Sequence, residues 1–341
     1  MRIGYSFWGF LGPGILDTPD GGRSHRRTLV DGLIGRGHDV VFLQANRDLD
    51  EAGHDLRGRY TWDLGLPDLD LLFLEWRWPI IGRNTTPCDA VGHTCDLHRQ
   101  RQLLQNYAAS GVRILLWDKD RRLPPGDPLR TAHGVTVLEP ALYPRPGAVR
   151  LLFPVSDDAL DRGLTTADEL AGLRRDLPLV YVGNQYDRNA AFDCYLAPAA
   201  AQVPHRVAGK WTRTARWPHV RFSGRIAFPD VDPLYRRALA TVLLLPDRYA
   251  AAGQMTQRLF EAVLAGCLPI TPATIRGAEH FTPAELHAAD GTAVLRLVQQ
   301  AQAIAGGREH AELIRGCLRK LDLFRLSRQL DVLDQVLGAD P

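Results

Sequence analysis

Short apolar runs alternate with helix-like stretches along most of the chain, and this alternation limits the fold more than any other feature. The first runs are MRIGYS, HDVVFLQA, DLLFLEW, VRILLWDKD, GVTVLEPA and VRLLFP, and helical patterns such as residues 23–35 and 96–110 lie between several of them. Strand patterns separated by helical patterns are typical of a parallel sheet with helices on its faces. The sequence therefore predicts an α/β fold.

The alternation stops once and then starts again. Residues 156–177 are charged and show no strand pattern, and beyond them come LVYVGN, HRVAG, HVRFSG, ATVLLLP and CLPITP. We therefore predict two Rossmann-like domains that face each other across a cleft. A cleft of this kind is the usual place for a small-molecule site. The predicted parts are an N-terminal acceptor-binding domain (1–155), a linker (156–177), a C-terminal donor-binding domain (178–310) and a C-terminal helix that covers both (311–341).

The composition fits a globular protein without cross-links. Of 341 residues, 45% are hydrophobic and 23% are charged, and the net charge of +2 gives no support to a nucleic-acid or membrane role. No signal peptide or bilayer-spanning stretch is recognisable, and the five scattered cysteines are typical of reduced thiols, so we predict a cytoplasmic protein. Only three of the 41 basic residues are lysines, which is typical of a GC-rich bacterial or phage gene.

A long loop rich in glycine and proline follows the first strand pattern. It leads to Asp20, Gly21 and Gly22 before a helix pattern that begins near Arg23. Glycines let the backbone approach a ligand, and a helix N-terminus favours an anion. A loop with Asp20 as a helix cap explains the same residues. The loop does not spell GxGxxG, which disfavours an NAD-dependent enzyme.

Aromatic and charged side chains follow strand patterns of the first half, where parallel sheets bind ligands. They suit a polyhydroxylated or planar acceptor, whereas the alternative is an ion pair with tryptophans packed under a loop. The predicted acceptor-binding residues are Trp8, Glu75, Trp76, Arg77 and Asp118.

Cysteine and histidine residues crowd into one stretch of the first half. Cys88, His93, Cys95 and His98 have the spacing Cys-x4-His-x-Cys-x2-His, which matches none of the common zinc patterns. We therefore expect a helix N-terminus with incidental thiols here, and no metal.

Polar and basic side chains follow strand patterns of the second half. An arginine on a loop at a sheet's carboxyl edge can hold a phosphate through two hydrogen bonds, although a solvated arginine is the simpler alternative. The predicted donor-binding residues of these loops are Asn184, Tyr186, Arg188, Lys210 and Arg225.

The segment RLFEAVLAGCLPITP, residues 258–272, reads as a short apolar helix that carries one carboxylate, Glu261. Such a carboxylate is either solvated or directed at a polar group in a cleft. Amides at the start of the helix would face an anion, and Glu261 could accept hydrogen bonds from hydroxyls of the same ligand. A nucleoside diphosphate has both groups. The predicted donor-binding residues here are Gly253, Gln254, Met255, Thr256, Arg258 and Glu261.

Residues 258–270 resemble the FEAMACGxPVI pattern of GT-B glycosyltransferases that use nucleotide sugars. Gly21-Gly22 and Gly37-His38 are similar to the N-terminal pattern of that group. The resemblance implies a GT-B fold and implies that Glu261 binds the ribose hydroxyls of the donor. Retaining members usually carry a second Glu where Gly253 stands here, so the stereochemistry stays open.

The leading hypothesis is a glycosyltransferase that needs no metal or other cofactor. It moves a sugar from a nucleoside-diphosphate sugar, with UDP as the commonest nucleotide of the resembling group, to an acceptor hydroxyl. Gly21 and Gly22 would approach the donor, and Asp20 or His25 would be the base of an inverting reaction. The alternatives are a nucleotide-sugar epimerase and a non-catalytic nucleotide-sugar binding protein.

Two kinds of acceptor fit the sequence. Trp8, Trp76 and Trp78 suit a flat natural product, whereas a phosphate backbone, such as hydroxymethylated DNA, suits a set of arginines: Arg23, Arg26, Arg27, Arg99 and Arg101. The nearly balanced charge favours the small molecule.

Overall fold

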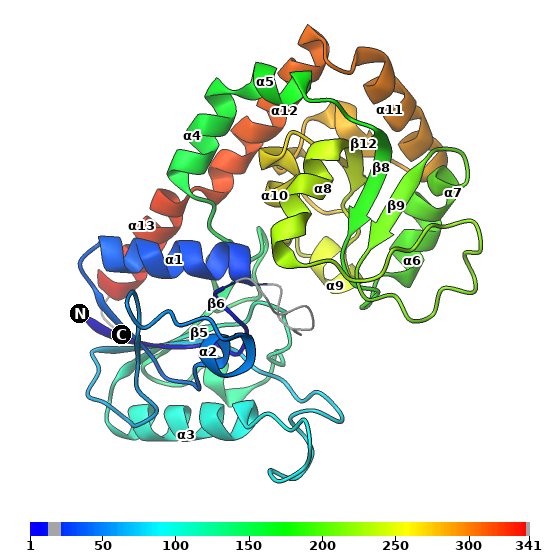
Figure 1. The fold of residues 1–341 in the computed structure, drawn as a ribbon. Coiled ribbons are helices and arrows are strands. Elements are labelled where there is room, and N and C mark those ends of the chain that lie inside the picture. The colour runs from blue at the N-terminus through cyan, green and yellow to red at the C-terminus, as the bar shows by residue number, and fades with distance from the viewer. Residues whose placement is uncertain (13–21, 339–341) are drawn as a thin grey trace. The chain divides into compact units, whose positions relative to one another are not determined.

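The computed structural model describes residues 1–12 and 22–338, which divide into two compact units (Figure 1). The described part of the first unit is residues 1–12, 22–152 and 329–338, and the second unit is residues 153–328. Each unit is built on one parallel β-sheet with helices on both faces.

The sheet of the first unit has seven strands in the order β3-β2-β1-β4-β5-β6-β7, all parallel. The strand order reverses between β1 and β4, and the crevice outside the carboxyl ends of strands at such a point is where open α/β sheets bind ligands. The strands are β1 (Arg2–Ser6), β2 (Asp39–Phe42), β3 (Thr61–Trp62), β4 (Leu71–Glu75), β5 (Arg113–Trp117), β6 (Val135–Glu139) and β7 (Val149–Arg150).

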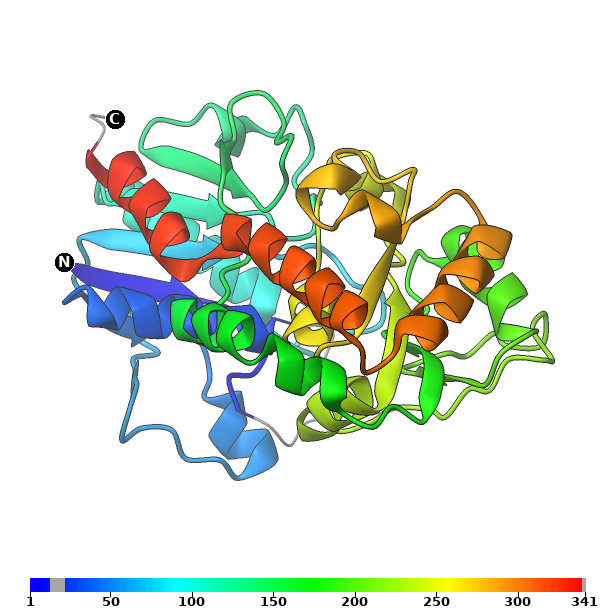
Figure 2. The ribbon, with the colours of Figure 1, turned by 90° about the horizontal axis from the view of Figure 1, so that it is seen from above.

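Helices cover both faces of this sheet. On one face lie α1 (Arg23–Gly35) and the end of α13 (Leu326–Gly338), and on the other lies α3 (Asp96–Ala109) (Figures 1 and 2). Arg36, just after α1, pairs with Asp331 of α13 at 2.7 Å. A core of Leu72, Leu103 and Leu116 joins α3 to the sheet. The unit also has the short helices α2 (Arg47–Ala52) and η1 (Pro128–Arg130).

The sheet of the second unit has five parallel strands in the order β12-β11-β10-β8-β9. They are β8 (Leu177–Val182), β9 (His205–Ala208), β10 (Ala238–Val242), β11 (Leu268–Pro272) and β12 (His287–Ala288). Val180 on β8, Leu234 on α8 (Val231–Arg237) and Ala262 on α10 (Arg258–Leu264) share one core, which holds both helices against the sheet.

The remaining helices of the second unit are mostly short. They are α4 (Asp157–Thr165), α5 (Ala167–Gly172), α6 (Asn189–Ala191), η2 (Phe192–Leu196), α7 (Ala197–Ala200), η3 (Phe228–Asp230), α9 (Asp247–Ala250), η4 (Ala278–His280), η5 (Ala284–Leu286), α11 (Gly291–Ile304), α12 (Arg308–Leu321) and η6 (Asp322–Phe324). None of the helices in the described ranges is long and apolar enough to cross a membrane.

Most of the predicted strands are present, with one exception. HVRFSG does not form a strand; it contributes a single bridge between Phe222 and Val207. The strands β3 and β12 were not predicted, because two residues are too few to show a period of two.

The C-terminal helical pattern is interrupted near residue 322. The chain leaves the helix there because Val155 forms a bridge with Arg325: its N–H donates to the carbonyl oxygen of Phe324, and its own carbonyl accepts from Leu326, both at 2.8 Å. Residues up to 328 belong to the second unit, and the part of α13 from Gln329 onward belongs to the first.

Candidate functional site

Two glycines remove side chains from the carboxyl ends of β8 and β9. Gly209 has φ +137°, and a Cβ atom there would lie 2.1 Å from the carbonyl oxygen of Gly183. A Cβ atom on Gly183 would in turn lie 2.4 Å from Nε of Arg258. Only glycine fits at either position. The backbones of Gly183 and Gly209 and the Arg258 guanidinium are therefore packed closely together at this edge of the second sheet.

Arg258 and Glu261 lie on the short helix α10. Arg258 Nε donates to the carbonyl oxygen of Val182 at 2.5 Å, which fixes the guanidinium beside the end of β8. Leu259 and Val263 of the same helix are buried, whereas Glu261 is half-buried. The Glu261 carboxylate is thus neither in the core nor fully solvated.

Two tyrosine hydroxyls accompany this pair. Within the described residues, the hydroxyls of Tyr181 and Tyr235 are buried and have no hydrogen-bond partner. Burial raises the pKa of Tyr235 well above its usual value, and the nearby Glu261 carboxylate adds to this rise. The Arg258 guanidinium lies 5.9 Å from the ring centroid of Tyr181. Buried hydroxyls normally have partners, so these two are unsatisfied polar groups beside Arg258 and Glu261.

Arginines concentrate positive charge near the same strand ends. Burial lowers the pKa of Arg188, and the neighbouring charges of Arg258 and Arg248 lower it further. Arg188 donates to the carbonyl oxygens of Leu244 at 3.1 Å and Tyr186 at 2.6 Å, so much of its guanidinium holds the backbone. Arg248 was not among the predicted residues, although it follows the strand pattern ATVLLLP directly.

The loops after β8 and β9 are tied together by side-chain amides. Oδ1 of Asn184 accepts a hydrogen bond from the N–H of Lys210 at 2.8 Å, and Oε1 of Gln185 accepts from the N–H groups of Thr212 and Arg213, both at 3.0 Å. Lys210 is exposed. Asn184 and Gln185 therefore hold the two loops together, and Lys210 is exposed at this edge of the sheet.

Tyr186 and Arg225, the remaining predicted residues of these loops, are exposed. The Arg248 guanidinium lies 5.6 Å from the ring centroid of Tyr186, which places Tyr186 beside the arginines.

Two of the amides predicted to face an anion are used within the protein. The N–H of Gly253 donates to the carbonyl oxygen of Ala250 at 3.3 Å, and that of Gln254 donates to Tyr249 at 2.9 Å. Both bonds close the turn after α9. Those two amides are therefore occupied, and the predicted anion contact from this segment is left to Met255 and Thr256.

In the first unit, Glu75 lies at the centre of a buried charged cluster at the end of β4. Its carboxylate accepts hydrogen bonds from the Tyr5 hydroxyl at 2.8 Å and from Nε and Nη2 of Arg26 at 2.8 and 2.7 Å. Lys119 Nζ lies 2.6 Å from the same carboxylate. Glu75 is 1% exposed, so its carboxylate is shielded from solvent by these contacts within the first unit.

A second buried group of charges lies at the ends of β5 and β6. Asp118 accepts hydrogen bonds from the N–H groups of Arg122 at 2.8 Å and Leu123 at 2.9 Å, and burial raises its pKa to about 6. Glu139 pairs with Arg121 and, at 2.9 Å, with Arg130. Asp118 therefore fixes the loop that follows its strand.

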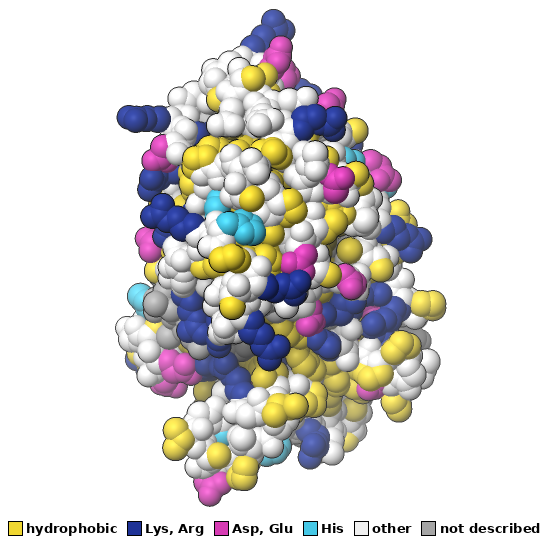
Figure 3. All heavy atoms as spheres, turned by 90° about the vertical axis from the view of Figure 1, so that its right-hand side faces the viewer, with side chains coloured by type: hydrophobic (Ala, Val, Ile, Leu, Met, Phe, Trp, Pro, Cys, Tyr) yellow, Lys and Arg dark blue, Asp and Glu magenta, His cyan; other side chains and the backbone are white. Residues whose placement is uncertain are grey.

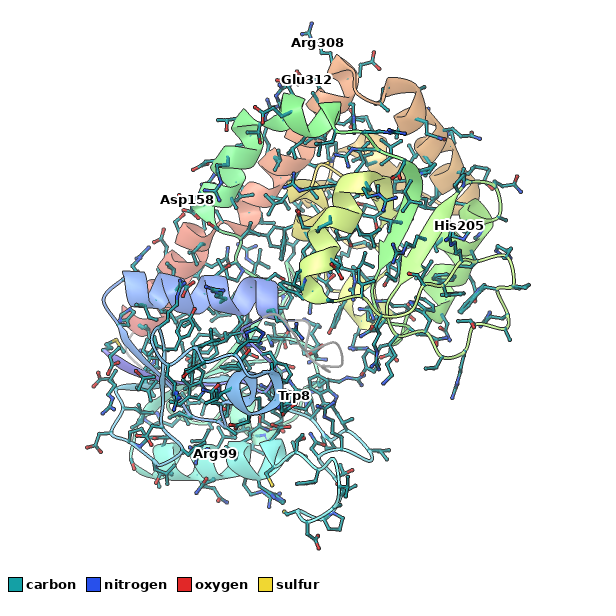
Figure 4. All side chains as sticks on the ribbon, viewed as in Figure 1. Trp8, Arg99, Asp158, His205, Arg308 and Glu312 are labelled. Carbon is teal, nitrogen blue, oxygen red and sulfur yellow. The ribbon has the colours of Figure 1, made fainter. Side chains whose placement is uncertain are left out.

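The predicted aromatic residues of the first unit pack on one another. The Arg77 guanidinium lies 4.5 Å from the ring centroid of Trp8, and the rings of Trp8 and Trp78 meet edge to face at 5.7 Å. Trp8 is buried beside α2, where its carbonyl oxygen accepts from Arg47 (Figure 4). Trp76 packs against the core instead.

The candidate bases differ in what the structure shows. His25 is 2% exposed and meets the ring of Trp117 edge to face at 5.6 Å. Gly22 caps α1 at its N-terminus. Asp20 and Gly21 lie outside the described residues.

Comparison with protein families gives a match over part of the chain. Residues 188–318 match the family model described as Glycosyl transferase-like. No curated protein matches the sequence.

Several solved structures are similar over nearly the whole chain. T4 phage BGT in complex with UDP and Mn2+ has a TM-score of 0.66 at 12% identity, over 99% of this chain and 100% of that one. The DNA modifying enzyme beta-glucosyltransferase, studied with and without uridine diphosphoglucose, has a TM-score of 0.60 at 11% identity, over 99% and 100%. AviGT4, a glycosyltransferase involved in avilamycin A biosynthesis, has a TM-score of 0.59 at 14% identity, over 99% and 98%. The chain therefore has the GT-B fold, and residues 188–318 are similar to the Glycosyl transferase-like family.

Proposed function

We propose that the chain transfers a sugar from a UDP-sugar to an acceptor hydroxyl. The observation that carries this proposal is the group formed by Arg258, Glu261 and the buried hydroxyls of Tyr181 and Tyr235, beside the ends of β8 and β9. A diphosphate suits the cations, and a ribose suits the carboxylate and hydroxyls. The structural likeness to proteins solved with UDP or uridine diphosphoglucose supports the choice of nucleotide.

The residues of the second unit would divide the donor between them. Glu261 accepts hydrogen bonds from the ribose hydroxyls, as the sequence resemblance implies. Lys210 and Arg258 lie at the diphosphate, where their charge stabilises the leaving group as the bond from the anomeric carbon to the phosphate oxygen breaks. Arg188 and Asn184 hold the loops after β8 and β9, and the second of these loops carries Lys210.

The acceptor hydroxyl must lose its proton as the new glycosidic bond forms. In an inverting reaction a general base takes that proton, and Asp20 and His25 are the two proposed bases. Asp20→Asn and His25→Gln distinguish them, because loss of the base abolishes transfer while donor binding persists. Metal independence is a prediction that reactions with and without added Mn2+ can test, since one similar structure holds Mn2+.

Thermal stabilisation by nucleotide sugars tests the donor site directly. A ligand that binds only the folded protein stabilises it by about 2.7 kcal/mol at one hundred times its Kd. We expect a UDP-sugar, rather than GDP-, TDP- or ADP-sugars, to raise the melting temperature, and we expect Glu261→Ala to remove the shift. Glu279→Ala is the matched control, because Glu279 is an exposed carboxylate of the same unit. An equal shift in Glu261→Ala would show that this carboxylate does not bind the donor.

We propose a small hydroxylated molecule as the acceptor. Arg23 and Arg26 are buried. Arg99 donates to the carbonyl oxygens of Leu43 and Gly65, both at 2.7 Å (Figure 4). Much of the basic set that would suit a phosphate backbone therefore serves the structure of the first unit. The likeness to AviGT4 agrees with a natural-product acceptor.

DNA is the second candidate acceptor, because a similar structure is that of a DNA modifying enzyme. Transfer to hydroxymethylated duplex DNA, with binding that weakens as salt rises, would favour it over the small molecule. Incubation with donor alone separates the remaining alternatives. An isomerised sugar indicates an epimerase, and tight binding without any turnover indicates a binding protein.

A further inference from the structure

Four potential metal ligands converge in the first unit, in the loop between β4 and α3. They are Cys88, His93, Cys95 and His98, and their ligand atoms all lie within 4.8 Å of one another. Sγ of Cys88 lies 3.2 Å from Nδ1 of His98. Tetrahedral zinc, with Zn–S of about 2.3 Å and Zn–N of about 2.0–2.1 Å, places neighbouring ligand atoms roughly 3.3–3.8 Å apart. Small side-chain rotations would bring these four to that geometry.

His93 is already oriented as a metal ligand. Its Nδ1 lies 3.0 Å from Oγ1 of Thr86, and the Thr86 hydroxyl lies 3.3 Å from the carbonyl oxygen of Arg83. When that hydroxyl donates to Arg83, its oxygen accepts from Nδ1–H and leaves the lone pair on Nε2. Within the described residues, Nε2 is buried without a hydrogen-bond partner. Metal-binding histidines characteristically have the second ring nitrogen held in this way.

The loop needs a cross-link, because it has little core of its own. Residues 79–95 form turns rather than a helix or strand, and Ile81 and Val91 are fully or nearly fully exposed. Apolar side chains stand on the surface at the lower edge of Figure 3, where this loop lies. Long irregular loops are uncommon in compact domains, and small segments without a core are often held by a metal.

We propose that Cys88, His93, Cys95 and His98 bind one zinc ion that holds this loop against the start of α3. The two thiols bind as thiolates and release their protons to solvent. Four protein ligands leave no open position, so the ion is structural rather than catalytic. The proposal is independent of the donor and acceptor assigned above.

The zinc ion would also support the end of β4. Cys95 and His98 lie at the start of α3, and Gln100 of the same helix holds Arg77 at both backbone groups: Oε1 accepts from its N–H at 2.7 Å, and Nε2 donates to its carbonyl at 3.1 Å. On the other side of the loop, Asn84 donates to the carbonyl oxygen of Trp78 at 3.1 Å. The ion thus fastens the segment that carries the predicted acceptor residues.

Metal analysis of the full chain without an affinity tag tests the site. We expect about one zinc ion per chain after dialysis. Cys88→Ser and His98→Ala should lose it, whereas Cys194→Ser and His280→Ala should keep it, because these exposed residues belong to the second unit. Substitution with Co2+ should give the visible absorption of a tetrahedral thiolate site. A wild-type protein that takes up neither metal, or one with a Cys88–Cys95 disulfide, would overturn the proposal.

Trypsin provides a readout of the loop itself. Arg83 is the only tryptic site within residues 79–95. A chelator should accelerate cleavage after Arg83 in the wild type, and added zinc should reverse the effect. Cys88→Ser should be cleaved rapidly with or without chelator. If the chelator leaves the rate unchanged in a protein shown to contain zinc, the ion does not hold this loop.

Discussion

The carboxyl ends of the two sheets differ in the side chains that follow their strands. In the first unit, charges meet one another: Glu75 is surrounded by Arg26, Lys119 and the Tyr5 hydroxyl, and all of these side chains are buried. In the second unit, Gly183 and Gly209 let the ends of β8 and β9 pack closely on each other and beside Arg258.

The carboxyl ends of parallel strands can therefore either support the following loops or bind a ligand. Parallel sheets bind ligands outside their carboxyl ends. Where the charges there pair with each other, the edge becomes a rigid support for the loops that follow it. Where tyrosine hydroxyls such as those of Tyr181 and Tyr235 are buried without a partner in the described residues, a ligand can complete their hydrogen bonds.

The largest expected effect comes from breaking the charged cluster. Glu75→Gln leaves Arg26 and Lys119 without their carboxylate, which should cost about 3–5 kcal/mol of stability. Hydrogen exchange of β4 and β5 peptides measures this loss in the first unit alone. Asp55→Asn is the control, because the exposed pair of Asp55 and Arg57 should contribute little to stability. Equal protection in the two variants would contradict the supporting role of the cluster.

A side chain between the ends of β8 and β9 should have the next largest effect. Gly209→Ala places a Cβ atom against the Gly183 carbonyl at a positive φ, so we expect a loss of about 1–3 kcal/mol and weaker UDP-sugar binding. Thermal melting with and without donor measures both. Gly172→Ala should leave both unchanged, because nothing lies within 4 Å of a Cβ atom there. Normal donor binding by Gly209→Ala would show that the donor does not use this edge.

The tyrosine hydroxyls of the second unit should affect donor binding more than stability. Tyr235→Phe removes a buried hydroxyl without a partner in the described residues, so the melting temperature should stay the same or rise, because the cost of burying that hydroxyl is lost. Donor affinity should fall roughly five- to tenfold if the ligand completes that hydrogen bond. Tyr195→Phe is the opposite case, since its hydroxyl lies 3.1 Å from Thr274 Oγ1. Tyr195→Phe should lose stability and keep its donor affinity. Calorimetric titration with a UDP-sugar measures both affinities, and an unchanged affinity in Tyr235→Phe would contradict the assignment.

Local patterns predicted much of the fold. The helix expected from Arg23 begins at that residue, and the pattern over residues 96–110 corresponds to α3. These predictions succeeded because periodicity and helix starts depend on neighbours in sequence. HVRFSG failed because its pairing is limited to one bridge with β9, and the extent of pairing depends on a distant strand.

The candidate sites were predicted less completely. The motif around Glu261 was visible in the sequence, but the two tyrosines were missed, because burial without a partner leaves no sequence signal. Spacing argued against a metal at Cys88, His93, Cys95 and His98, yet the loop brings their ligand atoms together. Spacing rules describe the common zinc motifs, whereas convergence depends on the turns between the ligands.

Local sequence was enough to predict the two parallel sheets, the helices that separate their strands and the position of a carboxylate in α10, because each depends on the order of nearby residues. The tertiary structure alone decided that Glu75 and Asp118 are buried within charge and hydrogen-bond networks, and that Gly183 meets Gly209. These contacts join residues far apart in sequence, and only the packed sheet brings such groups within hydrogen-bonding or steric range.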